Sequence, residues 1–360
     1  MLRYYYNFYR EYKNSLLGTR KKSPARTGYS QIGLINPSIG TTNMGDFIIY
    51  ESVYEHLRLM FPDSFLTNYP SQIHTSYDAK QSMGEKDALF VGGTNLLSSN
   101  MEEYYQWRID PMDMRYLKNK AVLMGVGWWQ YQEKPNSYTQ KLLKAVLSRD
   151  LIHSVRDSYT MNMLKSIGIE NVVNTTCPTL WNLNPQHCSE VPTRKASKVI
   201  TTLTFYKKNE VLDRRLLEIL TEQYQQVYLW VQGVEDVSYM QKIFPDYRKI
   251  TLIPPTIEAF NLLLADPEIE YIGTRLHAGV RAIQRQKRTL ILAVDNRALE
   301  IGKDTNLNVI PIKEVERSYD FIQHDYETAI RLPVKQITEW KNQFGTQTVP
   351  AKEKQLEPYM

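Results

Sequence analysis

Cysteine is scarce in this sequence, because Cys177 and Cys188 are the only two among 360 residues. Neither stands in a CxxC pair or near a run of histidines, so we expect two reduced thiols rather than a disulfide framework or a metal site. Long apolar runs are also missing, and residues 1–26 hold no continuous apolar segment of the kind that marks a secretory signal. These absences favour a cytoplasmic globular protein, with length enough for two domains.

A strong excess of one charge is missing as well, since the formal net charge is only +5 at pH 7. Six basic residues fall between Arg10 and Arg26 against one acid, Glu11. Nucleic-acid binding usually requires a basic face that extends along a domain. We therefore expect small anionic ligands and no nucleic-acid partner.

The first 29 residues form a basic, tyrosine-rich extension. If this segment is helical, one face collects apolar and aromatic side chains, namely Leu2, Tyr5, Tyr6, Tyr9, Tyr12 and Leu16. Two interpretations stay open. The extension is mobile or packs on itself, which we favour because termini are usually poorly fixed, or residues 1–26 rest peripherally on the anionic inner face of a membrane.

Short apolar runs alternate with helix-like patterns along the rest of the chain. In the first half, runs bounded by Gly, Asn or Pro occur at 31–36, 88–93, 121–127 and 151–155. In the second half they recur at 198–205, 226–232, 249–253, 269–274 and 288–294. Such alternation predicts an α/β fold with parallel sheets, here two Rossmann-like domains that face one another across a cleft.

The polar stretch at residues 184–197 holds two prolines and no hydrophobic period, so we interpret it as a linker. It separates an N-terminal Rossmann-like domain at 30–183 from a C-terminal one at 198–334. Residues 335–360 are expected to form a C-terminal helix and tail. Ligands of open α/β sheets bind beyond the carboxyl ends of the strands, so function is sought in the strand-to-helix turns.

The first of these turns, NPSIGTTNMGDF, combines glycines with Asn43 and Asp46. Gly45 lets the backbone approach a ligand, and the amide of Asn43 can both donate and accept hydrogen bonds, as a sugar hydroxyl requires. Asp46 is either a helix N-cap or a group presented to the same polar ligand. The turn matches neither phosphate-binding glycine motif, so it predicts a polar ligand rather than a phosphate.

Two further turns carry polar groups. After the run ALFVGG, Gly93 either serves tight packing of helix on strand or lines the cleft, and Asn95 suits both roles. The run LIHSV ends at Arg156, whose planar guanidinium either holds a carboxylate or phosphate at the cleft or pairs with Asp157.

The turn IEYIGTRLHAG places His277 in the first turn of a helix, two residues after Arg275. The positive field of the helix N-terminus lowers the pKa of a bare imidazole, and a bound dianion raises it again. His277 could therefore be charged when a substrate is present and donate its proton. Arg281 and Arg285 follow at helical spacing, and we interpret them as a solvated basic face.

The loop and helix after the run RTLILAV add Arg297 and Lys303. Both could help to bind an anion. The nearby acids Asp295, Glu300 and Asp304 offer routine ion pairs instead.

Taken in order, these turns resemble those of the polysaccharide pyruvyl transferase family. The matching elements span residues 31 to about 310, most of the chain, and RLHA is the most telling of them. They are the Asn-x-Gly-Asp turn at 43–46, Gly-Gly at 92–93, GVG at 125–127, SVRD at 154–157 and TRLHAG at 274–279.

The resemblance implies a two-domain fold similar to that of GT-B glycosyltransferases. It also implies transfer of pyruvate from phosphoenolpyruvate to a sugar, commonly as a ketal across two hydroxyls, in the synthesis of exopolysaccharide or cell-surface glycans. Phosphoenolpyruvate is then the co-substrate, and the acceptor is a sugar or a lipid-linked oligosaccharide. No cofactor and no metal are expected.

Site residues carry over from the resemblance position by position. His277 is implied as the general acid, with Arg156 and Arg275 as ligands of the donor's phosphate and carboxylate. The donor side further includes Leu276, Arg297 and Lys303. The acceptor side consists of Asn43, Gly45, Asp46, Gly93 and Asn95, and Trp128 and Trp129 either stack on a sugar ring or belong to the core.

This chain departs from the family pattern at two places, both of which we expect on the acceptor side. Thr94 stands where a third glycine is frequent, and Cys177 replaces an aspartate before a proline. One alternative is a GT-B-type glycosyltransferase that uses a sugar nucleotide, with Glu300 or Asp304 on the ribose. The other is a non-catalytic glycan-binding relative.

Overall fold

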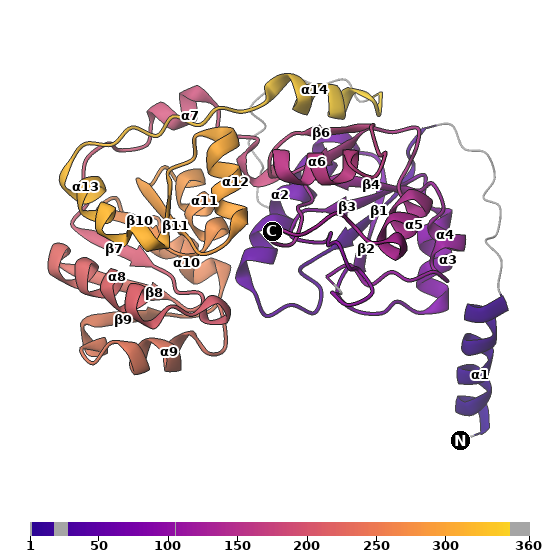
Figure 1. Ribbon diagram of the computed structural model, residues 1–360, viewed down its shortest axis with the longest axis horizontal. Coiled ribbons are helices and arrows are strands. Elements are labelled where there is room, and N and C mark those ends of the chain that lie inside the picture. Colours follow the sequence, from indigo (N-terminus) through magenta and orange to yellow (C-terminus); the bar gives the residue numbers. More distant parts are fainter. Residues whose placement is uncertain (1, 18–27, 105, 346–360) are drawn as a thin grey trace, which may run out of the picture.

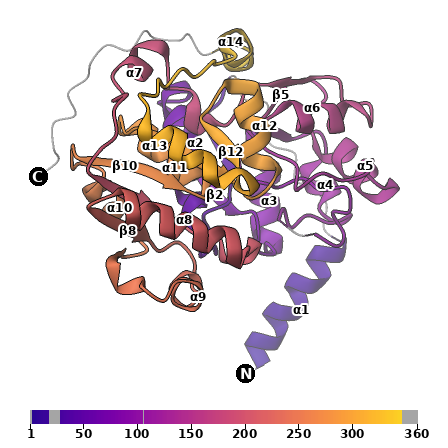
Figure 2. The same ribbon diagram turned by 60° about the vertical axis from the view of Figure 1, so that its left-hand side comes forward.

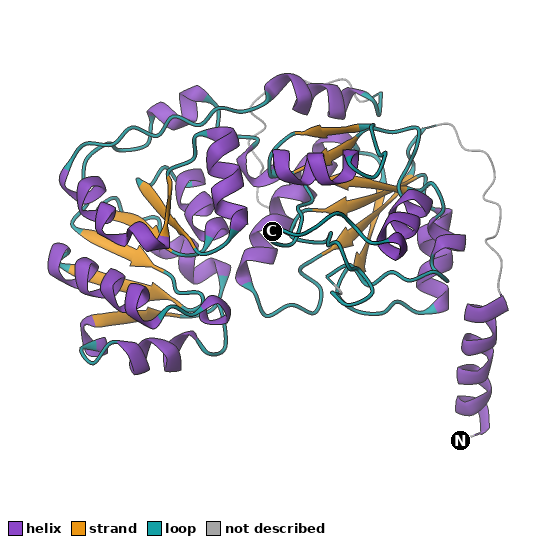
Figure 3. Ribbon diagram, viewed as in Figure 1, coloured by secondary structure: helices purple, strands orange, loops and turns teal. Residues whose placement is uncertain are grey.

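The computed structural model describes residues 2–17, 28–104 and 106–345, and it shows two α/β lobes side by side (Figure 1). Each lobe is a parallel sheet with helices on its faces, as the colouring by secondary structure makes visible (Figure 3). The prediction of an α/β fold with two Rossmann-like lobes, each built on a parallel sheet, is confirmed. Residues 18–27 of the predicted extension and 346–360 of the predicted tail lie outside the described residues.

The N-terminal lobe is built on a four-stranded parallel sheet with the order β2-β1-β3-β4. The parallel pair β5 and β6 continues it beyond β4 through a bridge between Val126 and Val155. The chain therefore changes its direction of winding between β1 and β3, and such a switch point is where doubly wound sheets bind ligands. The strands are β1 (Gln31–Asn36), β2 (Phe65–Pro70), β3 (Ala88–Gly92), β4 (Ala121–Met124), β5 (His153–Val155) and β6 (Val172–Asn174).

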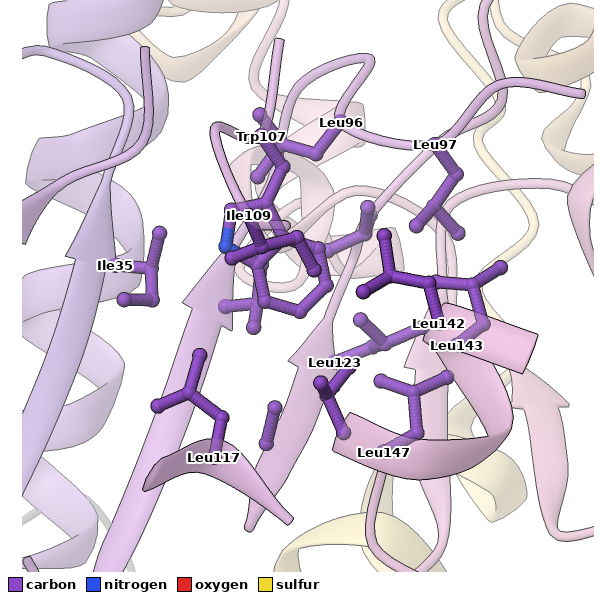
Figure 4. Close-up of a cluster of buried hydrophobic side chains, with 14 of the residues drawn as sticks. Ile35, Leu96, Leu97, Trp107, Ile109, Leu117, Leu123, Leu142, Leu143 and Leu147 are labelled. Atoms are coloured by element: carbon purple, nitrogen blue, oxygen red, sulfur yellow. The ribbon is translucent and has the colours of Figure 1, made fainter. Parts of the chain in front are cut away.

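Helices on both faces of this sheet close its core. Figure 4 shows one such cluster, in which Ile35 of β1, Leu123 of β4 and Leu142 of α5 are all buried. Each fully buried side chain of this kind stabilises the lobe by about 1.5–3 kcal/mol. The helices are α2 (Met44–Met60), α3 (Tyr77–Glu85), α4 (Met114–Leu117), α5 (Ser137–Val146), α6 (Ser158–Lys165) and the short 3-10 helix η1 (Pro178–Leu180).

The C-terminal lobe has a six-stranded parallel sheet with the order β12-β11-β10-β7-β8-β9. Its switch point lies between β7 and β10, which pair directly. The strands are β7 (Lys198–Thr201), β8 (Gln226–Trp230), β9 (Ile250–Ile253), β10 (Ile269–Gly273), β11 (Thr289–Ala293) and β12 (Val309–Pro311). The helices are α8 (Glu210–Gln223), α9 (Asp236–Ile243), α10 (Ile257–Leu263), α11 (Leu276–Gln284), α12 (Asn296–Thr305) and α13 (Ser318–Gln323), with 3-10 helices η2 (Phe205–Lys207), η3 (Tyr247–Lys249) and η4 (Ile312–Arg317).

The chain crosses between the lobes twice. The first crossing carries α7 (Pro185–Ser189), inside the stretch expected to be the linker. After α13 the chain returns, and α14 (Val334–Asn342) packs on β5 and β6 of the N-terminal lobe, above the label of β6 in Figure 1. Trp340 of α14 is fully buried there, with its ring 6.1 Å from that of Phe90 and 5.7 Å from that of Trp181.

One side chain at the junction of the lobes contradicts the sequence prediction. Arg281 is expected on a solvated face, but its side chain is only 12% exposed and pairs with Glu51 of α2 in the other lobe. Arg285, by contrast, is exposed at the end of α11. The prediction is wrong for Arg281 because α2 packs against α11 and covers that side of the helix.

Helix α1 (Leu2–Leu17) lies apart from both sheets and contacts α3, and it projects from the body in both views (Figures 1 and 2). Across residues 2–17, 28–104 and 106–345, no helix has the length and apolar character needed to cross a membrane.

Candidate active site

Two adjoining hollows lie where the switch points of the two sheets face each other. The inner hollow is lined by Gly45, Arg275, Leu276 and His277 among others. The outer hollow is lined mainly by turns of the N-terminal lobe, including Asp46, Asn95 and Trp129. Both hollows share Asn43, Tyr206, Asp295 and Arg297, so they form one continuous site.

Asn43 begins helix α2 at the border of the two hollows. Its side-chain Oδ1 accepts a hydrogen bond from the backbone N–H of Gly45 at 3.2 Å, which makes Asn43 the N-cap. The sequence leaves Asp46 as a possible cap, and that alternative is wrong because Asp46 lies in the first turn of the helix. Asp46 is therefore free to serve the outer hollow, which it lines.

The carboxylate of Asp46 is buried but held by two hydroxyls. Thr41 Oγ1 donates to Oδ2 at 2.9 Å, and Thr94 Oγ1 donates to Oδ1 at 3.2 Å. Burial raises the pKa of Asp46 above its ordinary value, and the hydroxyl donors partly offset that rise. A carboxylate with a raised pKa is a better proton acceptor than an ordinary surface aspartate.

Threonine at position 94, where the family pattern often has glycine, has a role that a glycine could not fill. Its φ of 51° lies in the left-handed region, where glycine is favoured and a β-branched residue is strained. Its hydroxyl supplies one of the two hydrogen bonds that hold Asp46. The strained residue thus adds a group that a glycine would lack.

Gly93 and Asn95 play different roles. Gly93 has a φ of 60°, and a Cβ there would lie 2.3 Å from Cγ2 of Ile49. It therefore allows α2 to pack closely on the sheet and lines neither hollow, although the sequence places it on the acceptor side. Asn95 does line the outer hollow, and its Oδ1 accepts a hydrogen bond from Nη1 of Arg156 at 2.8 Å.

Arg156 follows β5, is fully buried and lines neither hollow. Its Nε pairs with Asp157 Oδ2 at 3.1 Å, as the ion-pair interpretation predicts, and its role as a donor ligand stays a prediction. Its Nη2 is buried without a hydrogen-bond partner in the described part of the chain. The guanidinium lies on Gly127, where a Cβ would come within 2.2 Å of Cζ. Gly127 is a positioning residue that the sequence did not single out beyond the GVG match.

Arg275 occupies the N-cap position of α11 and lines the inner hollow. Its Nε donates to the carbonyl of Leu203 at 2.8 Å, and its guanidinium lies 4.8 Å from the ring centroid of Tyr206. Nη2 lies 3.5 Å from Asp236 Oδ1 without a hydrogen bond to any described residue. The side chain is thus fixed in direction, and its guanidinium lies beside the buried carboxylate of Asp236.

His277 lines the inner hollow from the first turn of α11 and is buried. Burial lowers its pKa to about 3, with Arg297 and Arg156 adding to the effect and Asp295 opposing it. The direction agrees with the sequence prediction, but burial and two arginines cause it rather than the helix N-terminus alone. At neutral pH the imidazole of the unliganded site is therefore uncharged.

Cys177 contacts the same imidazole, with its Sγ 3.6 Å from Nε2 of His277. The sequence relates the replacement at this position to the acceptor side more than to the donor side, and the structure shows that the turn before η1 brings it to His277. Burial raises the pKa of the Cys177 thiol, so it stays protonated. Cys188 lies elsewhere and is also a free, buried thiol.

Arg297 and Lys303 lie in different environments, and only Arg297 lines the hollows. Arg297 lines both hollows, pairs with Asp295 at 2.6 Å and donates from Nη2 to the hydroxyl of Tyr206 at 3.0 Å. Lys303 is exposed in the last turn of α12 and lines neither hollow. The structure therefore does not bring Lys303 together with the other candidate donor ligands.

An aromatic pair forms part of the outer hollow. The rings of Tyr104 and Trp129 stack at 3.9 Å with an interplanar angle of 18°, and both residues line the hollow. Trp128 belongs to the core, where it is fully buried. Sequence reasoning weighed both tryptophans but missed Tyr104, which lies in an irregular loop, and Tyr206, which follows β7.

Glu300 and Asp304, the acids that the sugar-nucleotide alternative would place on a ribose, accept hydrogen bonds from the N-terminal lobe. Asp304 accepts hydrogen bonds from the backbone N–H and hydroxyl of Ser158 at 2.7 and 3.0 Å, and one from Asn174 at 2.8 Å. Glu300 accepts from the hydroxyl of Tyr131 at 2.8 Å. Neither acid lines the inner or outer hollow. Within residues 2–17, 28–104 and 106–345, no cluster of three His, Cys, Asp or Glu side chains is arranged to hold a metal ion.

A family model described as polysaccharide pyruvyl transferase matches residues 43–296, well over half of the chain. None of the curated proteins compared with the chain matches it. Among solved structures, the UDP-GlcNAc 2-epimerase of Methanocaldococcus jannaschii is 11% identical, with a TM-score of 0.44 over 87% of this chain and 100% of that one. The E. coli heptosyltransferase WaaC is 9% identical, with a TM-score of 0.36 over 73% of this chain and 88% of that one.

Proposed function

Because this chain belongs to the polysaccharide pyruvyl transferase family of glycan biosynthesis, we propose that it transfers pyruvate from phosphoenolpyruvate to a sugar of a glycan precursor and forms a pyruvate ketal. One observation carries the proposal: Arg275, Arg297 and His277 converge on one small hollow. Two cations and an acid in such a space suit a small phosphorylated carboxylic acid. The proposed reaction needs no cofactor beyond the co-substrate itself.

The donor is proposed to occupy the inner hollow. Phosphoenolpyruvate carries its negative charge on a phosphate and a carboxylate, and guanidinium groups bind both by charge-assisted hydrogen bonds. Arg275 and Arg297 approach the hollow from the turns after β10 and β11. Arg156 adds positive charge from beneath, with its Nη2 still unpaired among the described residues.

His277 is proposed as the acid. Its pKa of about 3 in the unliganded site would leave it unprotonated at neutral pH. A bound donor brings two anionic groups next to the imidazole and offsets the charges of Arg297 and Arg156, which raises that pKa. Donor binding thereby loads the proton that the reaction consumes, and positioned proton transfer of this kind typically contributes about 10²–10⁴-fold.

The proposed reaction begins when His277 delivers its proton to the methylene carbon of the donor, so that the neighbouring carbon becomes cationic. A sugar hydroxyl attacks that carbon, the carbon–oxygen bond to phosphate breaks, and a second hydroxyl closes the ketal. The two hydroxyls release two protons: Asp46 takes that of the attacking hydroxyl and passes it to the departing phosphate, and the other restores His277. Arg275 and Arg297 offset the charge of the departing phosphate.

The acceptor is proposed to occupy the outer hollow. Its lining combines Asn95 and the carboxylate of Asp46, which can bind sugar hydroxyls, with the stacked pair of Tyr104 and Trp129, which offers an aromatic face to a sugar ring. Asp46 has a raised pKa and lies on the same continuous site as the donor hollow, so we assign it the proton of the attacking hydroxyl.

The test offers labelled phosphoenolpyruvate and extracts of glycan precursors to the purified protein and follows phosphate release and label transfer. We expect phosphate only when an acceptor is present, with the label in the glycan fraction. Sugar nucleotides are tested in parallel, since a glycosyltransferase would consume those and leave phosphoenolpyruvate intact. Transfer from a sugar nucleotide, or inactivity with both donors while folded, would refute the proposal.

A further inference from the structure

Helix α1 presents an aromatic surface that residues 28–104 and 106–345 leave largely uncovered. Phe8, Tyr9 and Tyr12 are 67%, 63% and 60% exposed, and their spacing places them on one side of the helix. The helix projects from the body in both views (Figures 1 and 2), and it contacts α3. Helix α1 contributes no residue to the lining of the inner or the outer hollow.

Such a helix is not expected to be stable on its own in water. At 16 residues it is close to the length at which an isolated helix is marginal, and it is rich in aromatic residues, which have only moderate helix propensity. Contiguous exposed aromatic side chains also cost free energy of hydration and mark interaction sites. A partner must therefore cover this side when α1 is formed.

The charges of α1 indicate what that partner is. Arg3, Arg10 and Lys13 are exposed, and Glu11 is the only acid of the helix. A helix with aromatic side chains on one side and a net positive charge has the composition of a segment that lies in the interface of a membrane. Anionic lipid headgroups complement its charge.

A second copy of the chain fits this surface less well. Helix pairs in water bury Leu, Ile and Val at their contacts, whereas α1 offers mainly tyrosines there. A tyrosine ring buries its apolar body and keeps its hydroxyl among polar groups, which is the environment of the headgroup region. We propose that α1 is an interfacial anchor that docks the protein on a bilayer containing anionic lipid.

The experiment measures co-sedimentation of the full chain with vesicles. Vesicles of phosphatidylglycerol mixed with phosphatidylcholine are compared with vesicles of phosphatidylcholine alone, at low and physiological salt. We expect partitioning onto the neutral vesicles to be at least about tenfold weaker, since each cation near an anionic surface contributes noticeably. Raising the salt should weaken binding to the anionic vesicles, because the lipid charge is screened.

Variants locate the effect on α1. The triple change Phe8→Ser, Tyr9→Ser, Tyr12→Ser and the double change Arg3→Glu, Arg10→Glu should each abolish sedimentation and leave the thermal midpoint of the body unchanged. Phe8→Ser is matched with Phe65→Ser, which alters a similarly exposed phenylalanine on β2 and should bind as the unaltered chain does.

Three results would overturn the proposal. The triple variant could bind anionic vesicles as strongly as the unaltered chain, or neutral and anionic vesicles could bind equally well. The third is a chain that ignores vesicles but forms a concentration-dependent dimer, lost in the triple variant, which would assign this surface to a second copy.

Discussion

The thiol sulfur of Cys177 lies 3.6 Å from Nε2 of His277, and both side chains are buried. A protonated thiol is neutral, so it cannot offset the positive charges of Arg297 and Arg156 on the imidazole. Burial is the main cause of the low pKa of His277, about 3, and the two arginines add to it. The proposed acid thus lies next to a neutral group at the position of Cys177.

Replacing that thiol by a carboxylate tests the relationship. Cys177→Asp should raise the pKa of His277, because an opposite charge favours the charged form. The acid then stays protonated to higher pH, so the basic limb of the kcat/KM profile should move upward in pH. Cys177→Ser keeps the neighbour neutral and serves as the control. Identical profiles for the Asp and Ser variants, both folded by circular dichroism, would contradict the assignment.

His277→Ala should remove the proton donor and leave the lobe intact, because the ring lines a hollow. We expect kcat to fall by about 10²–10⁴-fold, while calorimetry still detects phosphoenolpyruvate binding. His74→Ala is the matched control, since His74 is exposed away from the hollows. Turnover near that of the control would remove His277 from the role of acid.

Arg275→Ala should weaken donor binding, because it removes a cation that lines the inner hollow. We expect the dissociation constant of phosphoenolpyruvate to rise at least about tenfold, given that hydrogen bonds to charged groups contribute about 1.5–3 kcal/mol. Arg285→Ala alters an exposed arginine at the far end of the same helix and should leave the constant unchanged. An equal effect in both variants would point to loss of general positive charge instead of a specific contact.

Asp46→Asn should show whether Asp46 acts on the acceptor or on the donor. The amide can still interact with Thr41 and Thr94, so the turn is retained, but it cannot accept a proton from a sugar hydroxyl. We expect a fall in kcat with unchanged binding of phosphoenolpyruvate by calorimetry. A loss of donor affinity of the size seen for Arg275→Ala would show that Asp46 acts on the donor hollow.

Acid should destabilise the fold through buried histidines. Burial lowers the pKa of His56 and His153 to about 4, and that of His277 to about 3, against an ordinary value of 6.5. Between about pH 4 and pH 6.5 the unfolded chain binds more protons than the folded chain. The contribution of these histidines to the free energy of unfolding is therefore complete above about pH 6.5 and is lost as the pH falls toward 4. At pH 5 each of these three histidines lowers the free energy of unfolding by about 2 kcal/mol.

Urea unfolding at pH 7 and pH 5 measures this loss. The variant His277→Gln lacks one of the three groups, so its loss between the two pH values should be smaller by about 2 kcal/mol. An equal loss in the variant and the unaltered chain would show that His277 titrates normally in the folded state.

The fold could be predicted because its signals are local. Alternating apolar runs and helical periods define the strands and helices, and the rule that ligands bind at the carboxyl ends of strands brings Asn43, Arg275 and His277 to the site. Order along the chain alone also places Gly93 and Lys303 there. Their positions depend on which face of a helix or strand meets the cleft, and sequence order does not determine that.

Contacts between side chains far apart in the sequence were the main feature that the sequence did not predict. Glu51 covers Arg281 from the other lobe, and Cys177 reaches His277 from a turn a hundred residues earlier. No pattern around either residue indicates its partner, because the contact exists only once the lobes are docked. The unusual cysteine before Pro178 was visible as a departure, but its meaning required the neighbour to be known.

The double crossing of the chain limits how the two lobes can move. A pair of domains joined by one connection can twist as well as bend, whereas two connections leave mainly a bending motion. Because Trp340 is buried in the N-terminal lobe, the segment after α13 connects the two lobes a second time. We therefore expect only a small opening movement when a substrate enters, and cutting this segment should change the rate of product release more than the chemistry.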